Sequence, residues 1–204
     1  MKKQISFFLK TVFIGILALV VSACNPTPTP KPCVTTGTDF QNLYTSVVSA
    51  PGNSNAVTLD FEVHSYTFTL STNKTVCKFG YQSQPGIATT PYTIQIYDNS
   101  TSTLVCSVSG VFSSSSTSYV SPPSTVNLLA GHSYTLKRIQ TNWAGNIGNT
   151  IGRIVKNATM SPLAFPFNSG VMTITGSTFY FITPSAGSAV LTNVAIPFVD
   201  IVFQ

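Results

Sequence analysis

The sequence has few charged residues. Five residues are acidic and ten are basic among 204, so charged residues make up 7% of the chain, whereas hydrophobic residues make up 43%. Disordered chains combine high charge with low hydrophobicity, and this composition is the opposite. The scarcity of charge predicts a folded chain, and the lack of a basic stripe argues against nucleic-acid binding.

Residues that carry catalysis or hold metals are also scarce. The two histidines, His64 and His132, show no zinc-binding spacing, and no Gly-x-Ser-x-Gly motif is present. Asp60 and Glu62 form the closest acidic pair, and an i, i+2 spacing would place both carboxylates on one outer strand face, where such groups are usually solvated. The sequence therefore predicts a non-enzyme without a metal or cofactor.

No apolar run is long enough to span a membrane. The longest near the N-terminus, residues 11–23, has thirteen residues, whereas a membrane-spanning helix needs about 20. Lys2, Lys3 and Lys10 precede the run, and small residues end it. This arrangement predicts a secretory signal peptide.

The end of that run, Val21-Ser22-Ala23-Cys24, resembles the lipobox of bacterial lipoproteins, in which an aliphatic residue and two small residues precede a cysteine. The resemblance implies cleavage before Cys24 and attachment of acyl chains, such as palmitate, to it. The membrane would then be a partner, and the protein would reside in the bacterial cell envelope, at the outer membrane or cell surface. The alternative is an ordinary secreted protein.

These features divide the chain into three predicted parts. Residues 1–23 are the signal peptide, residues 24–33 are the lipidated cysteine with a Pro/Thr linker, and residues 34–204 are a single domain. The alternating prolines of the linker favour an extended polyproline II spacer. After cleavage seven basic and five acidic residues remain, a net charge of +2, so the basic character lies mostly in the signal.

Hydrophobic spacing predicts one short helix and many strands. Apolar residues at 40, 43, 44, 47 and 48 follow the potential cap Thr38 with helical spacing. Downstream, apolar residues alternate in runs separated by turn-forming clusters. Eight to ten short strands of this kind predict an all-β fold, an antiparallel β-sandwich that resembles a jelly roll.

The pattern is irregular in two places, at residues 59–70 and at residues 196–203. The runs beginning at Leu59 and Tyr66 differ in parity, so a bulge or bend is expected at His64 and Ser65. Residues 196–203 are apolar on both faces and are expected to form a central strand beginning near Pro197. Asp200 interrupts this run and is expected to be hydrogen-bonded to a neighbouring loop rather than catalytic.

Two stretches resemble jelly-roll domains of unknown function in bacterial surface proteins. Residues 126–136, VNLLAGHSYTL, are similar to a leucine, Ala-Gly turn and Tyr-Thr strand pattern. Residues 92–98, YTIQIYD, followed by residues 103–105, are similar to a strand pair around a polar turn. The resemblance covers residues 59–141 and implies a sandwich fold with an accessory, often carbohydrate-associated, role. It implies no catalytic residue.

Three cysteines remain once Cys24 is assigned to the lipid. Cys77 and Cys106 lie in alternating runs that could be neighbouring strands, and exported proteins permit disulfides. A Cys77–Cys106 bridge is one prediction, and two small buried side chains without a bridge are the other. Cys33 could pair with either cysteine or remain free.

The loop around Trp143 is the candidate ligand site. It holds the only tryptophan among several asparagines and glycines, directly after a predicted strand that carries Arg138. An aromatic plane suits the C–H face of a sugar, and the amide of Asn142 and the guanidinium of Arg138 suit its polar groups. The alternative is that Trp143 folds inward as part of the core.

Two function classes remain open. The first is a lipid-anchored envelope protein whose sandwich is a non-catalytic binding module, with polysaccharide as the first ligand to test. The second is a structural or adhesive envelope subunit that binds other proteins through strand edges or apolar patches.

Overall fold

A computed structural model of the chain describes residues 32–183 and 187–204. The signal peptide, lipidation at Cys24 and most of the linker are predictions that lie outside the described residues. Within these residues, no helix has the length and apolar character required to cross a membrane.

Helix α1 (Asp39–Val48) confirms the predicted helix. Thr38 caps it, because the Thr38 hydroxyl oxygen accepts a hydrogen bond from the backbone amide of Gln41 at 3.0 Å. The apolar residues share one face, and that face is buried. Its buried members are Phe40, Leu43, Tyr44 and Val47.

The rest of the described chain is rich in strands, and the strand pairs are antiparallel. Eight strands have six or more residues, in agreement with the eight to ten predicted, and six shorter strands bring the total in the described residues to fourteen. The longer strands are β1 (Asn53–Thr58), β2 (Val63–Leu70), β3 (Lys74–Tyr81), β4 (Tyr92–Asp98), β5 (Thr103–Gly110), β8 (Ser133–Gln140), β9 (Gly152–Asn157) and β11 (Met172–Tyr180). The shorter ones are β6 (Ser118–Val120), β7 (Val126–Leu128), β10 (Phe167–Ser169), β12 (Leu191–Thr192), β13 (Ala195–Pro197) and β14 (Asp200–Phe203). Single 3-10 turns are η1 (Pro85–Ile87) and η2 (Trp143–Gly145).

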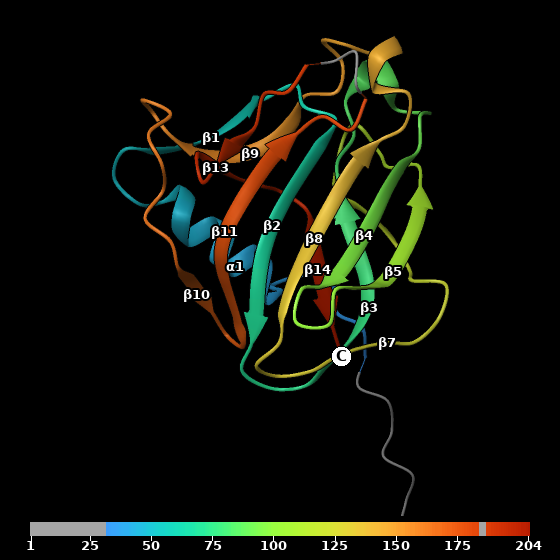
Figure 1. Cartoon of the computed structure of the whole chain (residues 1–204), viewed down its shortest axis with the longest axis vertical. Coiled ribbons are helices and arrows are strands. Elements are labelled where there is room, and N and C mark those ends of the chain that lie inside the picture. The colour runs from blue at the N-terminus through green and yellow to red at the C-terminus, as the bar shows by residue number, and fades with distance from the viewer. Residues whose placement is uncertain (1–31, 184–186) are drawn as a thin grey trace, which may run out of the picture. The chain divides into compact units, whose positions relative to one another are not determined.

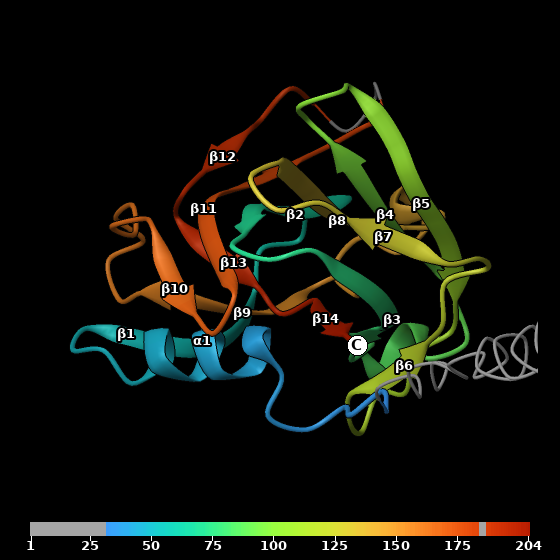
Figure 2. The ribbon, with the colours of Figure 1, turned by 90° about the horizontal axis from the view of Figure 1, so that it is seen from below.

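The strands form three sheets. A seven-stranded sheet has the order β10-β11-β2-β8-β4-β5, with β12 paired to β11. A four-stranded sheet has the order β14-β3-β6, with β7 paired to β3, and a three-stranded sheet has the order β1-β9-β13. Figures 1 and 2 show the large sheet as one layer, with α1, β3 and β14 across the core from it. The predicted all-β, antiparallel sandwich class is confirmed.

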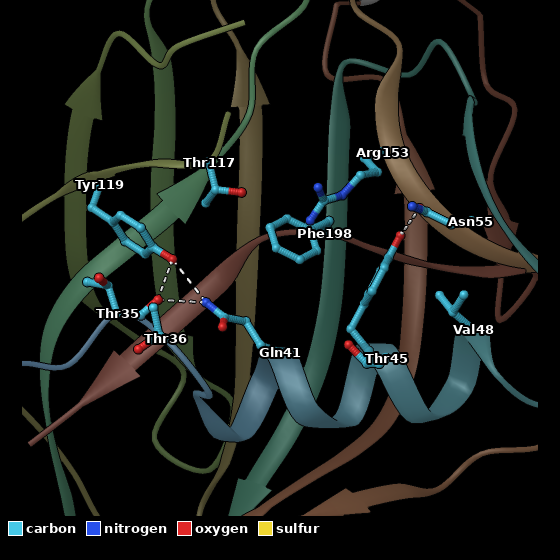
Figure 3. Close-up of a pocket in the computed structure, with 11 residues that line it drawn as sticks. Thr35, Thr36, Gln41, Thr45, Val48, Asn55, Thr117, Tyr119, Arg153 and Phe198 are labelled. Atoms are coloured by element: carbon cyan, nitrogen blue, oxygen red, sulfur yellow. Dashed lines mark hydrogen bonds between the residues drawn. The ribbon is translucent and has the colours of Figure 1, made fainter. Parts of the chain in front are cut away.

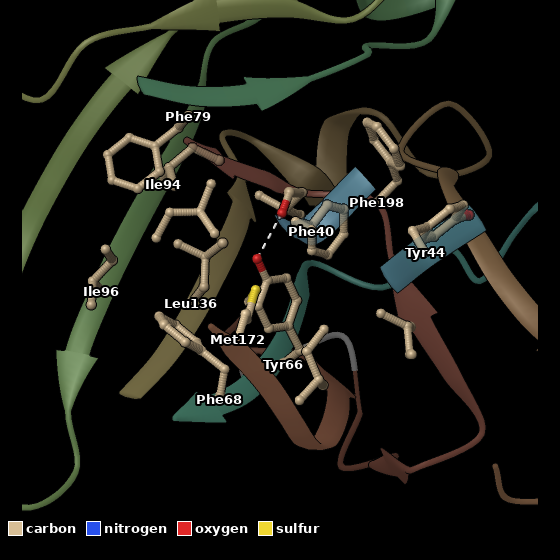
Figure 4. Close-up of a cluster of buried hydrophobic side chains, with 14 of the residues drawn as sticks. Phe40, Tyr44, Tyr66, Phe68, Phe79, Ile94, Ile96, Leu136, Met172 and Phe198 are labelled. Carbon is tan, nitrogen blue, oxygen red and sulfur yellow. Dashed lines mark hydrogen bonds between the residues drawn. The ribbon is translucent and has the colours of Figure 1, made fainter. Parts of the chain in front are cut away.

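The core between the layers is rich in aromatic side chains (Figure 4). Phe40 of α1 stacks on Tyr66 of β2 with ring centroids 5.2 Å apart, and it meets Phe198 edge-on at 5.5 Å. The buried Tyr66 hydroxyl donates to the carbonyl of Val199 at 2.8 Å. These contacts join α1, the large sheet and the C-terminal segment.

The prediction of one central strand over residues 196–203 is wrong. This segment ends β13 at the edge of the three-stranded sheet and continues as β14 at the edge of the four-stranded sheet. It is buried all the same, because α1 packs on β14 and β2 packs on β13. Pro197, which has no amide hydrogen, ends β13 rather than beginning a central strand.

The predicted bulge or bend at His64 and Ser65 is also wrong, because both residues lie within β2 and pair with β11 and β8 without a register shift. The chain turns earlier, in residues 59–62, which are not in a strand, and Leu59 has a φ of 67°. The side chain of His64 lies 2.8 Å from the Leu59 carbonyl through its Nε2 atom. The apparent alternation from Leu59 to Val63 therefore belongs to a turn held by side-chain contacts.

A disulfide joins Cys33 to Cys77, not Cys77 to Cys106. Cys77 lies on β3 of the four-stranded sheet, whereas Cys106 lies on β5 at the edge of the seven-stranded sheet. Cys106 is a buried thiol in the core, so the alternative prediction holds for Cys106 but not for the bridged, half-buried Cys77. The bridge fixes the segment before α1 to the domain.

Candidate functional site

The structure buries the predicted ligand residue Trp143. Its side chain is 6% exposed, its indole nitrogen donates to Asp60 Oδ1 at 3.0 Å, and its ring lies 4.7 Å from that of Phe181. Asn142 is exposed, with a left-handed backbone at φ 53°. Trp143 therefore closes the core, and it presents no ring to a ligand beside Asn142.

Arg138 is 0% exposed and cannot reach a ligand on the surface. Side chains of β8 alternate between half-buried and buried, and Arg138 has the buried parity. Its guanidinium donates to the carbonyls of Phe61, Glu62 and Thr150 at 3.3–3.4 Å. The structure therefore does not bring the three predicted ligand residues together as one site.

The acidic pair, Asp60 and Glu62, was expected to be solvated, but both carboxylates make hydrogen bonds within the protein. Asp60 accepts from Trp143 and from the backbone amide of Gly148. Glu62 is buried and accepts from the amides of Ile182 and Thr183 at 2.6 and 2.7 Å. Both carboxylates fix loops at this end of the sandwich, and neither faces solvent as part of a strand.

A cavity of about 540 Å³ lies elsewhere, beside α1 (Figure 3). Residues of α1, of the three-stranded sheet and of the four-stranded sheet line it, together with the segment before the helix. The lining consists of Thr35, Thr36, Gln41, Tyr44, Thr45, Val48, Asn55, Thr117, Tyr119, Arg153 and Phe198. Hydroxyls, amides, aromatic rings and one guanidinium thus face a common space.

Asp200 of β14 lies behind one end of the cavity and accepts hydrogen bonds from residues that line it. Its carboxylate is 0% exposed and accepts from the Thr38 hydroxyl at 2.7 Å, the Gln41 amide at 2.7 Å and the Tyr119 hydroxyl at 3.0 Å. Burial raises the pKa of Asp200, although these hydrogen bonds partly oppose the rise. The prediction that Asp200 is hydrogen-bonded is confirmed, but of its three side-chain partners only Thr38 lies in a loop, since Gln41 belongs to α1 and Tyr119 to β6.

Tyr119 and Gln41 connect this carboxylate to the cavity wall. The Tyr119 hydroxyl and the Gln41 amide lie 3.0 and 2.9 Å from the carbonyl of Thr35. Burial, followed by the nearby charge of Asp200, raises the pKa of Tyr119 to about 12, so its hydroxyl remains a proton donor at neutral pH. Since Cys33 is tied to Cys77, the wall around Thr35 is fixed at both ends.

Arg153 of β9 lies at the other end, beside Phe198 and Asn55 (Figure 3). Its guanidinium carbon is 3.4 Å from the centroid of the Phe198 ring. Its Nη1 donates to Gln82 at a long 3.4 Å, and its Nε has no partner within the described residues. Burial lowers the pKa of Arg153, but its guanidinium is a cation at neutral pH.

Comparison with known proteins returns no matching family model and no similar curated protein. The geometry of the chain is therefore the basis for any assignment. In the part of the chain that the structure describes, no group of three His, Cys, Asp or Glu side chains could hold a metal ion. The cavity lining contains none of these four residue types.

Sequence reasoning missed this cavity, because its lining runs from Thr35 to Phe198. One signal was available. The chain has two arginines, and Arg138 shares the parity of the apolar residues Tyr134 and Leu136, which indicates an inward side chain. Arg153 was the better candidate for contact with a ligand.

Proposed function

We propose that the chain is a lipid-anchored protein of the bacterial envelope whose β-sandwich is a non-catalytic binding module for glycans. The observation that carries the proposal is the composition of the cavity beside α1. Its hydroxyl and amide groups suit sugar hydroxyls, and the half-buried ring of Tyr119 suits the C–H face of a pyranose, whereas the rings of Tyr44 and Phe198 are buried against each other. Its volume lies within the range of about 300–1,000 Å³ found for small-ligand sites.

Two further features support the envelope location. The Cys33–Cys77 disulfide fits an oxidising compartment outside the cytoplasm. The Val21–Cys24 sequence, which lies outside the described residues, fits lipid attachment. A domain held by such an anchor would bind its ligand at the membrane surface.

A glycan-array screen of the full-length chain in detergent tests the binding function. Thr45 is an exposed residue of α1 that lines the cavity, so Thr45→Trp should fill the cavity without disturbing the core. The matched control is Ser46→Trp, because Ser46 is exposed on the same helix and does not line the cavity. We expect glycan binding by the wild type and by Ser46→Trp, and loss of binding in Thr45→Trp.

Two outcomes count against this proposal. Absence of glycan binding by a wild type that is folded by circular dichroism contradicts the glycan module itself. Equal binding by Thr45→Trp and the wild type contradicts the assignment of the cavity as the binding site.

The second candidate function is that of an envelope subunit that pairs with other proteins. Strand β5 favours it, because among the described strands β5 pairs only with β4, and it carries no charged side chain over Thr103–Gly110. Exposed edge strands usually carry charges or proline that prevent pairing. If β5 pairs with another chain, the mass in sedimentation equilibrium should rise with concentration, and Ser107→Lys should keep the protein monomeric.

A further inference from the structure

The cation in the cavity lacks a carboxylate partner. All five acidic residues of the chain lie in the described part, and their only ion pair there is that of Asp98 with His132. Three of the others are committed to hydrogen bonds: Asp60 and Glu62 in the loops near Trp143, and Asp200 behind the cavity. No carboxylate of the described chain therefore forms an ion pair with Arg153, although the charge of Asp200 acts on it from behind the cavity.

The two arginines differ in how their guanidinium groups are satisfied. Arg138 is fully buried and donates to three backbone carbonyls through its two Nη atoms, and only its Nε lacks a partner in the described residues. Arg153 is partly buried, makes one long hydrogen bond to Gln82 and lines the cavity. An arginine that is partly removed from water and has donors left over is suited to a planar, two-oxygen anion, because its N–H groups form a fork.

The negative charge nearest to the cavity does not block such an anion. Asp200 does not line the cavity, whereas Gln41 and Tyr119 do, and both of these side chains donate to its carboxylate. An anion in the cavity would thus contact Arg153 directly and would meet Asp200 only behind two hydrogen-bond donors. The hydroxyls of Thr45 and Thr117 and the Nδ2 of Asn55 remain for neutral parts of the ligand, whereas the Asn55 Oδ1 already accepts from the Tyr44 hydroxyl.

We infer that the cavity selects glycans that carry a carboxylate, namely uronic acids, and that Arg153 binds the carboxylate group. The inference rests on the proposed glycan-binding function and specifies its ligand class. Phe198 holds the guanidinium from one face, so that the edge of the group is presented to the ligand. The preference for acidic over neutral sugars should depend both on the positive charge of Arg153 and on the forked arrangement of its guanidinium N–H groups.

The test uses two matched sugar pairs. Glucuronate and glucose differ at C6, as do galacturonate and galactose, so each pair isolates the carboxylate. The full-length chain in detergent is titrated with each sugar at constant ionic strength, and binding is followed by NMR shifts. We expect each acid to bind roughly tenfold or more tightly than its neutral partner, the ratio typical of a charged hydrogen bond.

Variants at position 153 test whether Arg153 causes the preference for acidic sugars. Arg153→Gln removes the charge and should abolish the preference for the acids, and Arg153→Lys should restore only part of it, since Lys lacks the fork. The control is Lys156→Gln, which makes the same change in net charge on the opposite face of β9, outside the cavity lining. It should retain the full preference.

The outcomes separate the inference from the proposed function. Equal binding of acidic and neutral sugars, or a preference that survives in Arg153→Gln, overturns the uronic acid inference and leaves a neutral-glycan module intact. Absence of any bound glycan on the array overturns both. If Arg153→Gln does not fold, the acid-to-neutral ratio of the wild type, and its loss in Thr45→Trp, still decide the question.

Discussion

The loop end of the sandwich around Trp143 and the cavity beside α1 each combine an arginine with aromatic rings, but the polar atoms of the two regions have different hydrogen-bond partners. At the loop end, Arg138, Asp60 and Glu62 make hydrogen bonds to backbone groups or to Trp143. At the cavity, Arg153 faces a space of about 540 Å³.

This difference distinguishes structural from candidate binding groups. A buried polar group that the chain itself satisfies stabilises the fold, because leaving it unpaired would cost about 1–3 kcal/mol. A polar group beside a cavity has donors left for a ligand. We therefore expect substitutions at the loop end to lower stability without a selective effect on glycan binding. Substitutions at the cavity should weaken glycan binding and cost less stability.

The largest effect is expected for Arg138→Ala. It leaves the carbonyls of Phe61 and Thr150 without this donor and opens a void beside the rings of Tyr81 and Tyr92, so the free energy of unfolding should fall by about 3–5 kcal/mol. Arg153→Ala should cost only about 1–2 kcal/mol, chiefly through its contact with Phe198. Urea unfolding measures both. Equal losses for the two arginines would remove the proposed difference between the regions.

Loss of the disulfide should have the next largest effect on stability, and it should also weaken binding in the cavity. The bridge closes a separation of 44 residues, for which chain entropy gives up to about 4 kcal/mol. We expect the Cys33→Ser, Cys77→Ser double variant to lose about 2–4 kcal/mol in urea unfolding and to bind glycans more weakly, because Thr35 and Thr36 line the cavity. The control Cys106→Ala should lose about 1 kcal/mol and bind normally. Unchanged binding in the double variant would show that this wall is dispensable.

A smaller effect is expected for Trp143→Phe. The change removes the hydrogen bond to Asp60 and keeps an aromatic ring, so it should cost about 1–2 kcal/mol in thermal or urea unfolding. Glycan binding should be unchanged. Selective loss of glycan binding in a folded Trp143→Phe protein would indicate that the ligand site is the loop around Trp143 and not the cavity beside α1.

The smallest effect expected is the pH dependence due to Asp200. Its raised pKa means that the folded state holds this proton more tightly than the unfolded state does. The stability it contributes is complete below its ordinary pKa of 3.8 and is lost as pH rises through the raised value. Relative to Asp200→Asn, the wild type should therefore lose stability from about pH 4 to neutral pH, measured by urea unfolding at each pH. A difference that does not vary with pH would contradict the direction of this shift.

Local patterns in the sequence sufficed for the elements whose side chains alternate regularly. The apolar spacing after Thr38 located α1, and alternation of period two located β4 and β8. The same pattern failed at Leu59–Val63, because a turn held by His64 has side-chain spacing similar to that of a strand. It also failed over residues 196–203, where burial came from two different sheets.

The sequence by itself determined the all-β sandwich and its one helix, because both depend on periodicities of two and of three to four residues within short segments. Tertiary structure alone decided that Cys33 pairs with Cys77, that Trp143 closes the core and that Arg153 lines a cavity. Each of these depends on which sheet a strand joins. That choice brings together residues as distant as Thr35 and Phe198, and no local pattern encodes it.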